Sequence, residues 1–242
     1  MTDSATFDAA ITVPVHTSTN GIFVSFEGGD GCGKTTQSTL LGEWLAQALG
    51  TEVNLTREPG GTPLGREIRQ LLLHGDDMGS RAEALLYAAD RSHHIDTVVR
   101  PALDRGEVVV TDRYIDSSVA YQGGGRELTP TQVRGLSLWA TEGLMPHLTV
   151  LLDISPEAGA ARFTDAPDRL ERSGDEFHRR TRQTYLDMAA DEPARWIVVD
   201  AHGTIEDIAR EVRTRATQCL SALFPQHAQA LNSALEAEGS RP

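Results

Sequence analysis

Short apolar segments alternate along this chain with longer segments in which apolar residues recur at helical spacing. The short segments are rich in Val, Ile, Leu and Phe and predict buried strands at residues 21–27, 52–56, 107–111, 148–153 and 196–200. The longer segments predict helices at residues 35–49, 64–73, 80–103, 129–142, 156–163, 174–190 and 204–223. This alternation favours an α/β fold with a five-stranded parallel sheet flanked by helices on both faces.

The pattern contains no internal repeat and no linker between two globular halves, so we expect one domain at residues 21–222. Residues 1–20 carry no Lys or Arg and are interpreted as a loose N-terminal extension. Residues 223–242 are interpreted as a C-terminal tail that is either a frayed helix or disordered. We predict neither a signal peptide nor a membrane span. Two cysteines, Cys32 and Cys219, do not make a disulfide framework, so we expect the chain in the cytoplasm.

The charge balance limits the classes of ligand. Lys and Arg total 22 and Asp and Glu total 35, which gives a formal net charge of −13 over 242 residues. This balance argues against a broad nucleic-acid-binding surface, and any anion site must concentrate its positive charge locally. Lys34 is the only lysine of the chain. Lys and Arg are not interchangeable where a compact charge must fit a tight loop, so Lys34 marks a candidate site.

The segment around Lys34 fits the phosphate-binding pattern G-x-x-x-x-G-K-S/T and lies between a predicted strand and a predicted helix. In such a loop, backbone N–H groups and the helix N-terminus surround phosphate oxygens. The lysine reaches the β- and γ-phosphates, and the Thr35 hydroxyl can bind Mg²⁺. The predicted residues of this nucleoside triphosphate site are Gly28, Gly29, Asp30, Gly31, Cys32, Gly33, Lys34, Thr35 and Thr36.

A phosphate-binding loop does not identify the reaction by itself. A GTPase would need an N-K-x-D guanine motif, which a chain with one lysine cannot contain. Asp112 and Arg113 follow a predicted strand, at the edge of the sheet where ligands bind in open α/β folds. Asp112 could hold Mg²⁺ through water, and Arg113 could face a phosphate. The alternative is an Asp–Arg pair that only closes the strand.

Five segments in this order and spacing are more specific: residues 26–36, 56–62, 112–126, 151–157 and 168–171. Together they resemble bacterial thymidylate kinases, over roughly residues 21–220. The resemblance implies a P-loop NTPase fold with an Arg-rich lid at about residues 162–175. It also implies ATP and dTMP as substrates, Mg²⁺ as cofactor, direct in-line phosphoryl transfer to give dTDP, and a homodimer.

The resemblance further implies an acceptor site. Asp30 would meet the 3′-hydroxyl of the deoxyribose, with Tyr121 beside the sugar, and Arg69 and Arg113 would hold the monophosphate. In the thymine pocket, Glu58 and Pro59 would form an apolar wall and the ring of Tyr87 would stack on the base. Arg91 would donate a hydrogen bond to O4, and Ser118 and Gln122 would lie near the N3–H edge. Helical spacing alone would instead give a core Tyr87 and a surface Arg91.

Some thymidylate kinases carry an arginine directly after the acidic residue of the P-loop, where this chain has Gly31. A second cation at the transferred phosphoryl group is therefore expected from the Arg-rich lid, with Arg169 ranked before Arg162 and Arg172 in reserve. Cys32, in the loop before a helix N-terminus, is expected to favour the thiolate. The predicted catalytic residues are Asp30, Lys34, Arg113, Arg162 and Arg169.

Two rival functions stay open beside ATP-dependent phosphorylation of dTMP. A deoxynucleoside kinase shares the P-loop, but it has no use for both Arg69 and Arg113 at an acceptor phosphate. A nucleotide-gated binding protein that hydrolyses ATP slowly would need a Gln or Glu to position water, and a partner surface. The terminal segments could supply such a surface.

Overall fold

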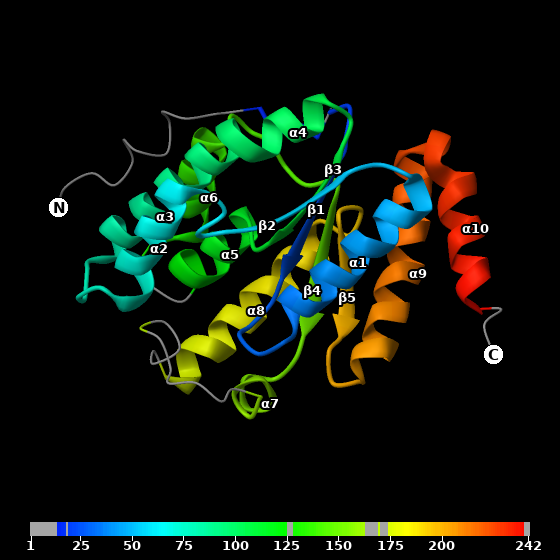
Figure 1. The fold of residues 1–242 in the computed structure, drawn as a ribbon. Coiled ribbons are helices and arrows are strands. Elements are labelled where there is room, and N and C mark those ends of the chain that lie inside the picture. Colours follow the sequence, from blue (N-terminus) through cyan, green and yellow to red (C-terminus); the bar gives the residue numbers. More distant parts are fainter. Residues whose placement is uncertain (1–13, 18, 125–127, 163–168, 170–173, 240–242) are drawn as a thin grey trace.

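The computed structural model describes residues 14–17, 19–124, 128–162, 169 and 174–239. It confirms the predicted sheet, whose five parallel strands lie in the order β2-β3-β1-β4-β5 (Figure 1). The strands are Ile22–Glu27 (β1), Val53–Arg57 (β2), Val108–Asp112 (β3), Leu148–Asp153 (β4) and Trp196–Asp200 (β5). Phe26 of β1 lies beside Asp112 of β3, and Glu27 lies beside Leu151 of β4. The carboxyl ends of the three central strands therefore meet at one edge.

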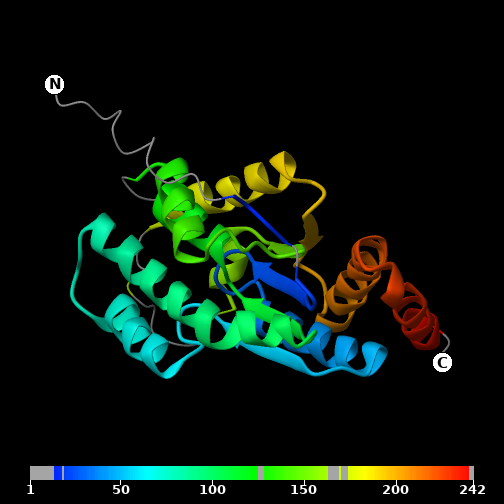
Figure 2. The same cartoon turned by 90° about the horizontal axis from the view of Figure 1, so that it is seen from above.

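Helices cover both faces of the sheet (Figure 2). They are Lys34–Leu49 (α1), Pro63–His74 (α2), Ser80–His94 (α3), Arg100–Asp104 (α4), Ile115–Ser118 (α5), Pro130–Ala140 (α6), Pro156–Ala160 (α7), Asp175–Asp191 (α8), Ile205–Leu223 (α9) and Ala228–Gly239 (α10). α1 and α9 pack on one face, while α4, α5, α6 and α8 pack on the other. This arrangement follows from the continuous apolar strands, which need cover on both sides.

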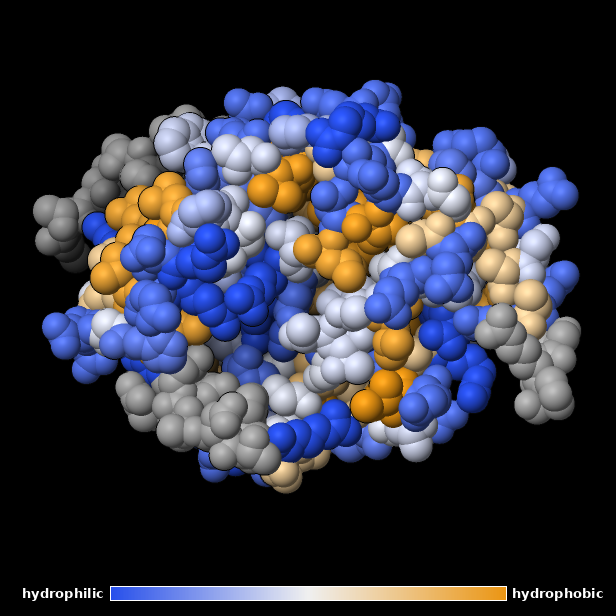
Figure 3. Space-filling model, viewed as in Figure 1, coloured by the Kyte–Doolittle hydropathy of each residue, from blue (hydrophilic) through white to orange (hydrophobic). Residues whose placement is uncertain are grey.

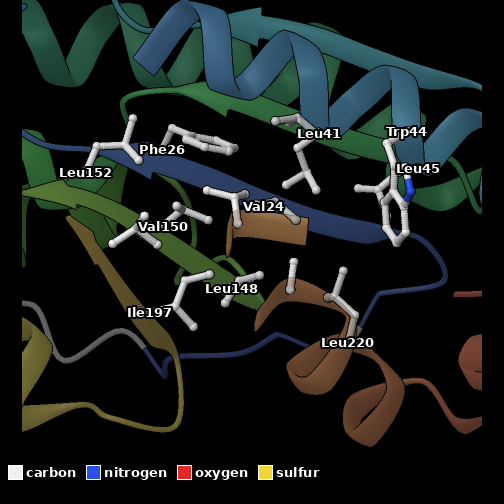
Figure 4. Packing of buried hydrophobic residues seen from close by; sticks show 14 of the residues in the cluster. Val24, Phe26, Leu41, Trp44, Leu45, Leu148, Val150, Leu152, Ile197 and Leu220 are labelled. Carbon is white, nitrogen blue, oxygen red and sulfur yellow. The ribbon is translucent and has the colours of Figure 1, made fainter. Parts of the chain in front are cut away.

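The core between α1, α9 and the sheet anchors the loop that follows β1 (Figure 4). Leu45 of α1 and Leu220 of α9 are fully buried, and so are Val24 and Val150 of the central strands. Burial of each such side chain stabilises the fold by roughly 1.5–3 kcal/mol. Because α1 is fixed in this way, the helix N-terminus that carries Lys34 is held against the end of β1.

Two irregular turns interrupt the predicted periodicity. The helix predicted at residues 80–103 changes into a π-helical turn at Ile95–Val99 before α4 begins. Pro101 has no N–H for the helical ladder, which favours a wider turn just before it. A second π-helical turn, Val119–Gly124, extends α5, and the sequence analysis assigned no element there. Tyr121 and Gln122 belong to this turn.

Of the two alternatives expected for the C-terminal segment, the structure shows the helix, and this helix is packed on the core rather than frayed. α10 packs against α9 and α1, and its Leu231 is fully buried in the core. Ala234 and Leu235 recur at helical spacing and pack against the same core. At the other end, His16 pairs with the backbone of Gly143 and Met145. Residues 1–13, most of the predicted N-terminal extension, lie outside the described residues.

The surface seen in Figure 3 is mainly hydrophilic, with apolar side chains in small groups. Within the described residues, none of the helices has the length and apolar character needed to cross a membrane. Most of the expected lid, residues 163–168 and 170–173, lies outside the part of the chain that the structure describes.

Candidate active site

The phosphate-binding loop joins β1 to α1, as the sequence predicts. Lys34 is the first residue of α1, and its Nζ donates hydrogen bonds to the carbonyl oxygens of Gly28, at 3.2 Å, and Gly29, at 2.8 Å. Gly31 has φ +75°, and a Cβ there would lie 2.3 Å from the carbonyl oxygen of Gly159. Only glycine fits this position. The position that carries an arginine in some related enzymes therefore cannot hold one in this loop.

Cys32 corrects one expectation. Its side chain is 1% exposed, and its Sγ lies 3.6 Å from the Nζ of Lys34. Burial raises the pKa of the thiol, and the neighbouring positive charge of Lys34 does not outweigh that effect. The predicted thiolate was wrong because the residue faces the core beneath the loop, where a charge is poorly solvated.

Thr35, in the first turn of α1, and Asp112, at the end of β3, come together as predicted for a magnesium site. The Thr35 Oγ1 donates to the Asp112 Oδ2 at 2.5 Å. Among the described residues, no three His, Cys, Asp or Glu side chains gather to hold a metal by themselves. Mg²⁺ in nucleotide sites takes few protein oxygens and completes its octahedron with phosphate oxygens and water. This hydroxyl–carboxylate pair fits that requirement.

Asp30 and Arg113 form an ion pair at the centre of the site. Tyr121 donates its hydroxyl to the other Asp30 oxygen at 2.9 Å, and the Arg113 guanidinium lies 5.0 Å from the centre of the Tyr121 ring. Burial by itself would raise the pKa of Asp30, but the charges of Arg113 and Lys34 hold it below its ordinary value. Arg113 has φ +73°, a strained backbone for an arginine, which is typical of functional positions.

A buried group behind Arg113 was missed by the sequence analysis. Arg113 donates to Ser117 Oγ at 3.1 Å, and Ser117 donates in turn to Glu27 at 2.5 Å. Tyr185 also donates to Glu27, at 3.1 Å. Burial and the nearby Asp116 raise the pKa of Glu27 to about 7. The available signal was a carboxylate that ends an apolar strand directly before the P-loop.

Arg91 is buried, whereas helical spacing alone would place it on the surface. It is 2% exposed, and its Nε donates to Glu58 Oε2 at 2.7 Å. Its terminal nitrogens donate to Ser137 and Ser118, both at 3.0 Å. A planar guanidinium with so many fixed bonds has one orientation, so Arg91 is a rigid part of the pocket wall.

The same Glu58 carboxylate is held from its other side. His94 Nδ1 lies 2.9 Å from Glu58 Oε1, and His94 Nε2 lies 2.7 Å from Thr56 Oγ1. Asp90 accepts the N–H of Gly60 at 3.1 Å, and burial together with Glu58 raises the pKa of Asp90 to about 6. Thr56, His94 and Asp90 were not identified from the sequence, because their pattern is that of an ordinary strand and helix.

All ten residues predicted for the acceptor site line one pocket, which we call the acceptor pocket; they are Asp30, Glu58, Pro59, Arg69, Tyr87, Arg91, Arg113, Ser118, Tyr121 and Gln122. A second depression, the donor hollow, is lined by Asp30, Gly31, Gly33, Lys34, Thr35, Thr36, Arg57, Glu58, Arg69, Asp112, Arg113 and Arg162. The two share four residues, Asp30, Glu58, Arg69 and Arg113. Burial, and after it the charges of Arg57 and Arg113, lower the pKa of Arg69.

The lid arginines occupy places that differ from their predicted order. Arg162, ranked second, donates to the carbonyl oxygens of Gly31, at 3.3 Å, and Ala201, at 2.7 Å, and lines the donor hollow. Arg169, ranked first, is 7% exposed and pairs with Glu83 of α3 at 2.6 Å. Arg172 lies outside the described residues. The structure therefore places Arg162, and not Arg169, beside the P-loop.

Comparison with known proteins identifies the family. A family model described as thymidylate kinase matches residues 26–212. The chain is 58% identical to a thymidylate kinase of Bifidobacterium longum (strain NCC 2705) over 194 residues, 78% of this chain and 94% of that protein. It is also 58% identical to one from Leifsonia xyli subsp. xyli, over 205 residues, 83% of this chain and 97% of that protein. A crystal structure of the Ehrlichia chaffeensis thymidylate kinase matches with a TM-score of 0.68 and 32% identity, over 81% of this chain and 97% of that one. The chain belongs to the thymidylate kinase family.

Proposed function

We propose that the acceptor pocket and the donor hollow together carry out the reaction of this family, transfer of the γ-phosphoryl group of ATP to dTMP to give dTDP and ADP. The observation that supports this most strongly is that both sites share Asp30, Glu58, Arg69 and Arg113. An acceptor phosphate and a donor phosphate would therefore meet between the two arginines. Such a meeting permits direct in-line transfer without a covalent intermediate on the protein.

On the donor side, Lys34 and the loop of residues 28–36 would bind the ATP phosphates. Phosphate oxygens are stronger acceptors for the ammonium than the two carbonyl oxygens that it contacts in this structure. Thr35 and Asp112 would hold Mg²⁺, which when bound neutralises charge on the phosphate oxygens. Arg162 would supply the second cation at the transferred group, because of the two lid arginines 162 and 169 that the structure describes it is the one beside the loop.

On the acceptor side, Arg69 and Arg113 would bind the dTMP phosphate, and Asp30 would accept the 3′-hydroxyl. The side chain of Tyr121 is fixed by Asp30 and would exclude a 2′-hydroxyl. The thymine would lie against Pro59 and Tyr87, with Arg91 at O4 and Ser118 and Gln122 near the N3–H edge. Each of these residues lines the acceptor pocket, and this shared location supports the assignment.

A steady-state ADP-release assay with dTMP, thymidine, dCMP and dGMP as acceptors tests the function. We expect dTMP to be phosphorylated with by far the highest kcat/KM. Equal use of thymidine would contradict the acceptor-phosphate role of Arg69 and Arg113 and would favour a deoxynucleoside kinase. ADP release at the same rate without any acceptor would favour the slow nucleotide-gated ATPase instead.

We further propose that residues 21–222 carry the complete site, in a homodimer located in the cytoplasm and without a nucleic-acid partner. A groove between α3 and α6 supports the dimer, since two large apolar residues that line it, Leu85 and Trp139, are 58% and 60% exposed. Sedimentation should give twice the mass of one chain, and Trp139→Glu should shift it toward the monomer. A monomeric native protein would contradict the dimer and leave the kinase assignment unaffected.

A further inference from the structure

A buried carboxylate lies behind the acceptor pocket without lining it. Glu83 of α3 is 1% exposed. One of its oxygens accepts a hydrogen bond from Gln122 Nε2 at 3.0 Å, and the other pairs with Arg169 Nη2 at 2.6 Å. Gln122 is itself 1% exposed and does line the pocket. The side chains therefore form a row that runs from the pocket wall inward, in the order Gln122, Glu83, Arg169.

The chemistry of this row fixes the direction of the Gln122 amide. An ionised carboxylate can only accept hydrogen bonds, whereas an amide has a donating end and an accepting end. The Arg169 guanidinium supplies the positive charge that a buried carboxylate requires. Glu83 therefore binds the NH₂ end of Gln122, and the Oε1 end remains for the pocket. Within the described part of the chain, this Oε1 has no hydrogen-bond partner.

Arg169 is held by more than this carboxylate. Its Nε donates to the carbonyl oxygen of Leu72 at 2.8 Å, and its backbone N–H donates to that of Leu73 at 3.3 Å. The guanidinium is thus anchored to the end of α2 and can keep Glu83 charged and oriented. This arrangement gives Arg169 a role on the acceptor side, away from the phosphates.

We propose that Glu83 is a positioning residue that sets base specificity through Gln122. A base with an N–H at position 3, such as thymine or uracil, can donate to the amide oxygen that Glu83 holds toward the pocket. Cytosine has an acceptor at N3 and would meet that oxygen with a repulsive contact. The inference rests on the proposed function, because it requires that the base lies beside Gln122.

The test measures kcat/KM for dTMP, dUMP and dCMP in the native enzyme and in Glu83→Gln. A glutamine at position 83 can donate as well as accept, so the Gln122 amide is free to turn. We expect the dTMP-to-dCMP preference to fall by about tenfold or more. The dTMP-to-dUMP preference should stay within about twofold, because both bases carry the same N3–H. Damage that is merely structural would not separate these two ratios.

Two further variants complete the test. Glu67→Gln makes the same change on an exposed residue of α2 and should leave both preferences unchanged. The double variant Glu83→Gln with Arg169→Gln removes both buried charges together, which avoids an unpaired charge if the single variant folds poorly. It should lose the dTMP-to-dCMP preference to a similar extent.

An unchanged dTMP-to-dCMP preference in the folded variants would overturn the proposal, and so would an equal fall in both preferences. A native enzyme that does not phosphorylate dTMP would instead overturn the proposed function. The two failures are distinguishable, because the second appears before any variant is made.

Discussion

The acceptor pocket and the donor hollow share Asp30, Glu58, Arg69 and Arg113 in their walls but are otherwise built differently. In the acceptor pocket, charged side chains are buried and bonded to one another, as in the pairing of Arg91 with Glu58, both of which are 2–3% exposed. In the donor hollow, Thr35 is exposed and Lys34 contacts backbone carbonyls. The acceptor side is therefore preorganised by protein contacts alone, whereas the donor side is arranged to exchange its contacts for phosphate oxygens.

This difference has a physical reason. Reading a neutral base requires fixed donors and acceptors, because a mobile group could satisfy the wrong base equally well. Binding a polyphosphate requires mainly positive charge and N–H groups at the right distance, and the phosphates themselves order those groups. Changes on the donor side should therefore reduce the reaction rate, and changes on the acceptor side should alter affinity, selectivity or stability.

The largest effect is expected on the donor side, from Lys34→Arg. The change keeps the positive charge but spreads it over the larger, planar guanidinium group. The space is tight, because the Lys34 side chain is only 7% exposed. We expect kcat to fall on the order of a thousandfold, with an unchanged circular dichroism spectrum. Arg180→Lys, on an exposed part of α8, is the matched control and should keep full activity. Near-native activity of Lys34→Arg would show that this site tolerates either cation.

The variants Arg162→Ala and Arg169→Ala together compare the two lid arginines directly. Arg162 touches the P-loop carbonyl of Gly31, so its loss should lower kcat by roughly 100- to 1,000-fold and change either KM much less. Arg169→Ala should mainly raise the KM for dTMP and reduce stability, because Arg169 pairs with Glu83. Steady-state kinetics on both variants shows which of the two arginines contributes more to kcat. A larger kcat loss for Arg169→Ala would restore the ranking predicted from the sequence.

Arg69→Ala addresses the phosphate end of the acceptor pocket. Arg69 donates to the carbonyl oxygen of Pro59 at 3.0 Å and has the charges of Arg57 and Arg113 nearby. We expect the KM for dTMP to rise by about 10- to 100-fold and the KM for ATP to change little. Arg66→Ala removes an exposed arginine from the same helix and serves as the control. An equal rise in both KM values would place Arg69 on the donor phosphates instead.

The smallest effect concerns how much the buried charges of the acceptor side destabilise the fold. Asp90 has a folded pKa of about 6, above the value of 3.8 for a free side chain, and its Oδ2 has no hydrogen-bond partner in the described structure. The folded state binds the proton more tightly, so stability should fall as pH rises from about 4 to about 7. Asp90→Asn should be more stable than the native protein by roughly 1–3 kcal/mol at pH 8 and equal to it near pH 3.5.

Denaturant unfolding across that pH range measures the effect. Asp77→Asn, at an exposed position between α2 and α3, should leave the pH profile of the native protein unchanged. A stability difference between Asp90→Asn and the native protein that is the same at about pH 3.5 and about pH 8 would contradict this prediction. It would show that ionisation of Asp90 does not destabilise the folded state.

Functional residues that belong to a short local motif could be predicted from the sequence. The P-loop, Asp112 and Arg113 each follow a recognisable strand, and the alternation of strands and helices determined the sheet. Glu27, Glu83 and His94 were missed because their partners are far away in the sequence; Glu27 and Tyr185, for example, are 158 positions apart. The position of Arg169 could not be predicted either, since it depends on a buried carboxylate whose burial only the folded chain defines.

Crystal structures of the protein alone and with dTMP and a non-hydrolysable ATP analogue would show which side of the site rearranges when substrates bind. We expect Lys34 Nζ to leave the carbonyl oxygens of Gly28 and Gly29 for phosphate oxygens, while Arg91 remains bonded to Glu58 at 2.7 Å. The contrary result is a Lys34 that keeps its carbonyl contacts while Arg91 separates from Glu58 to reach the base. It would mean that the acceptor pocket, and not the donor hollow, adapts to its substrate.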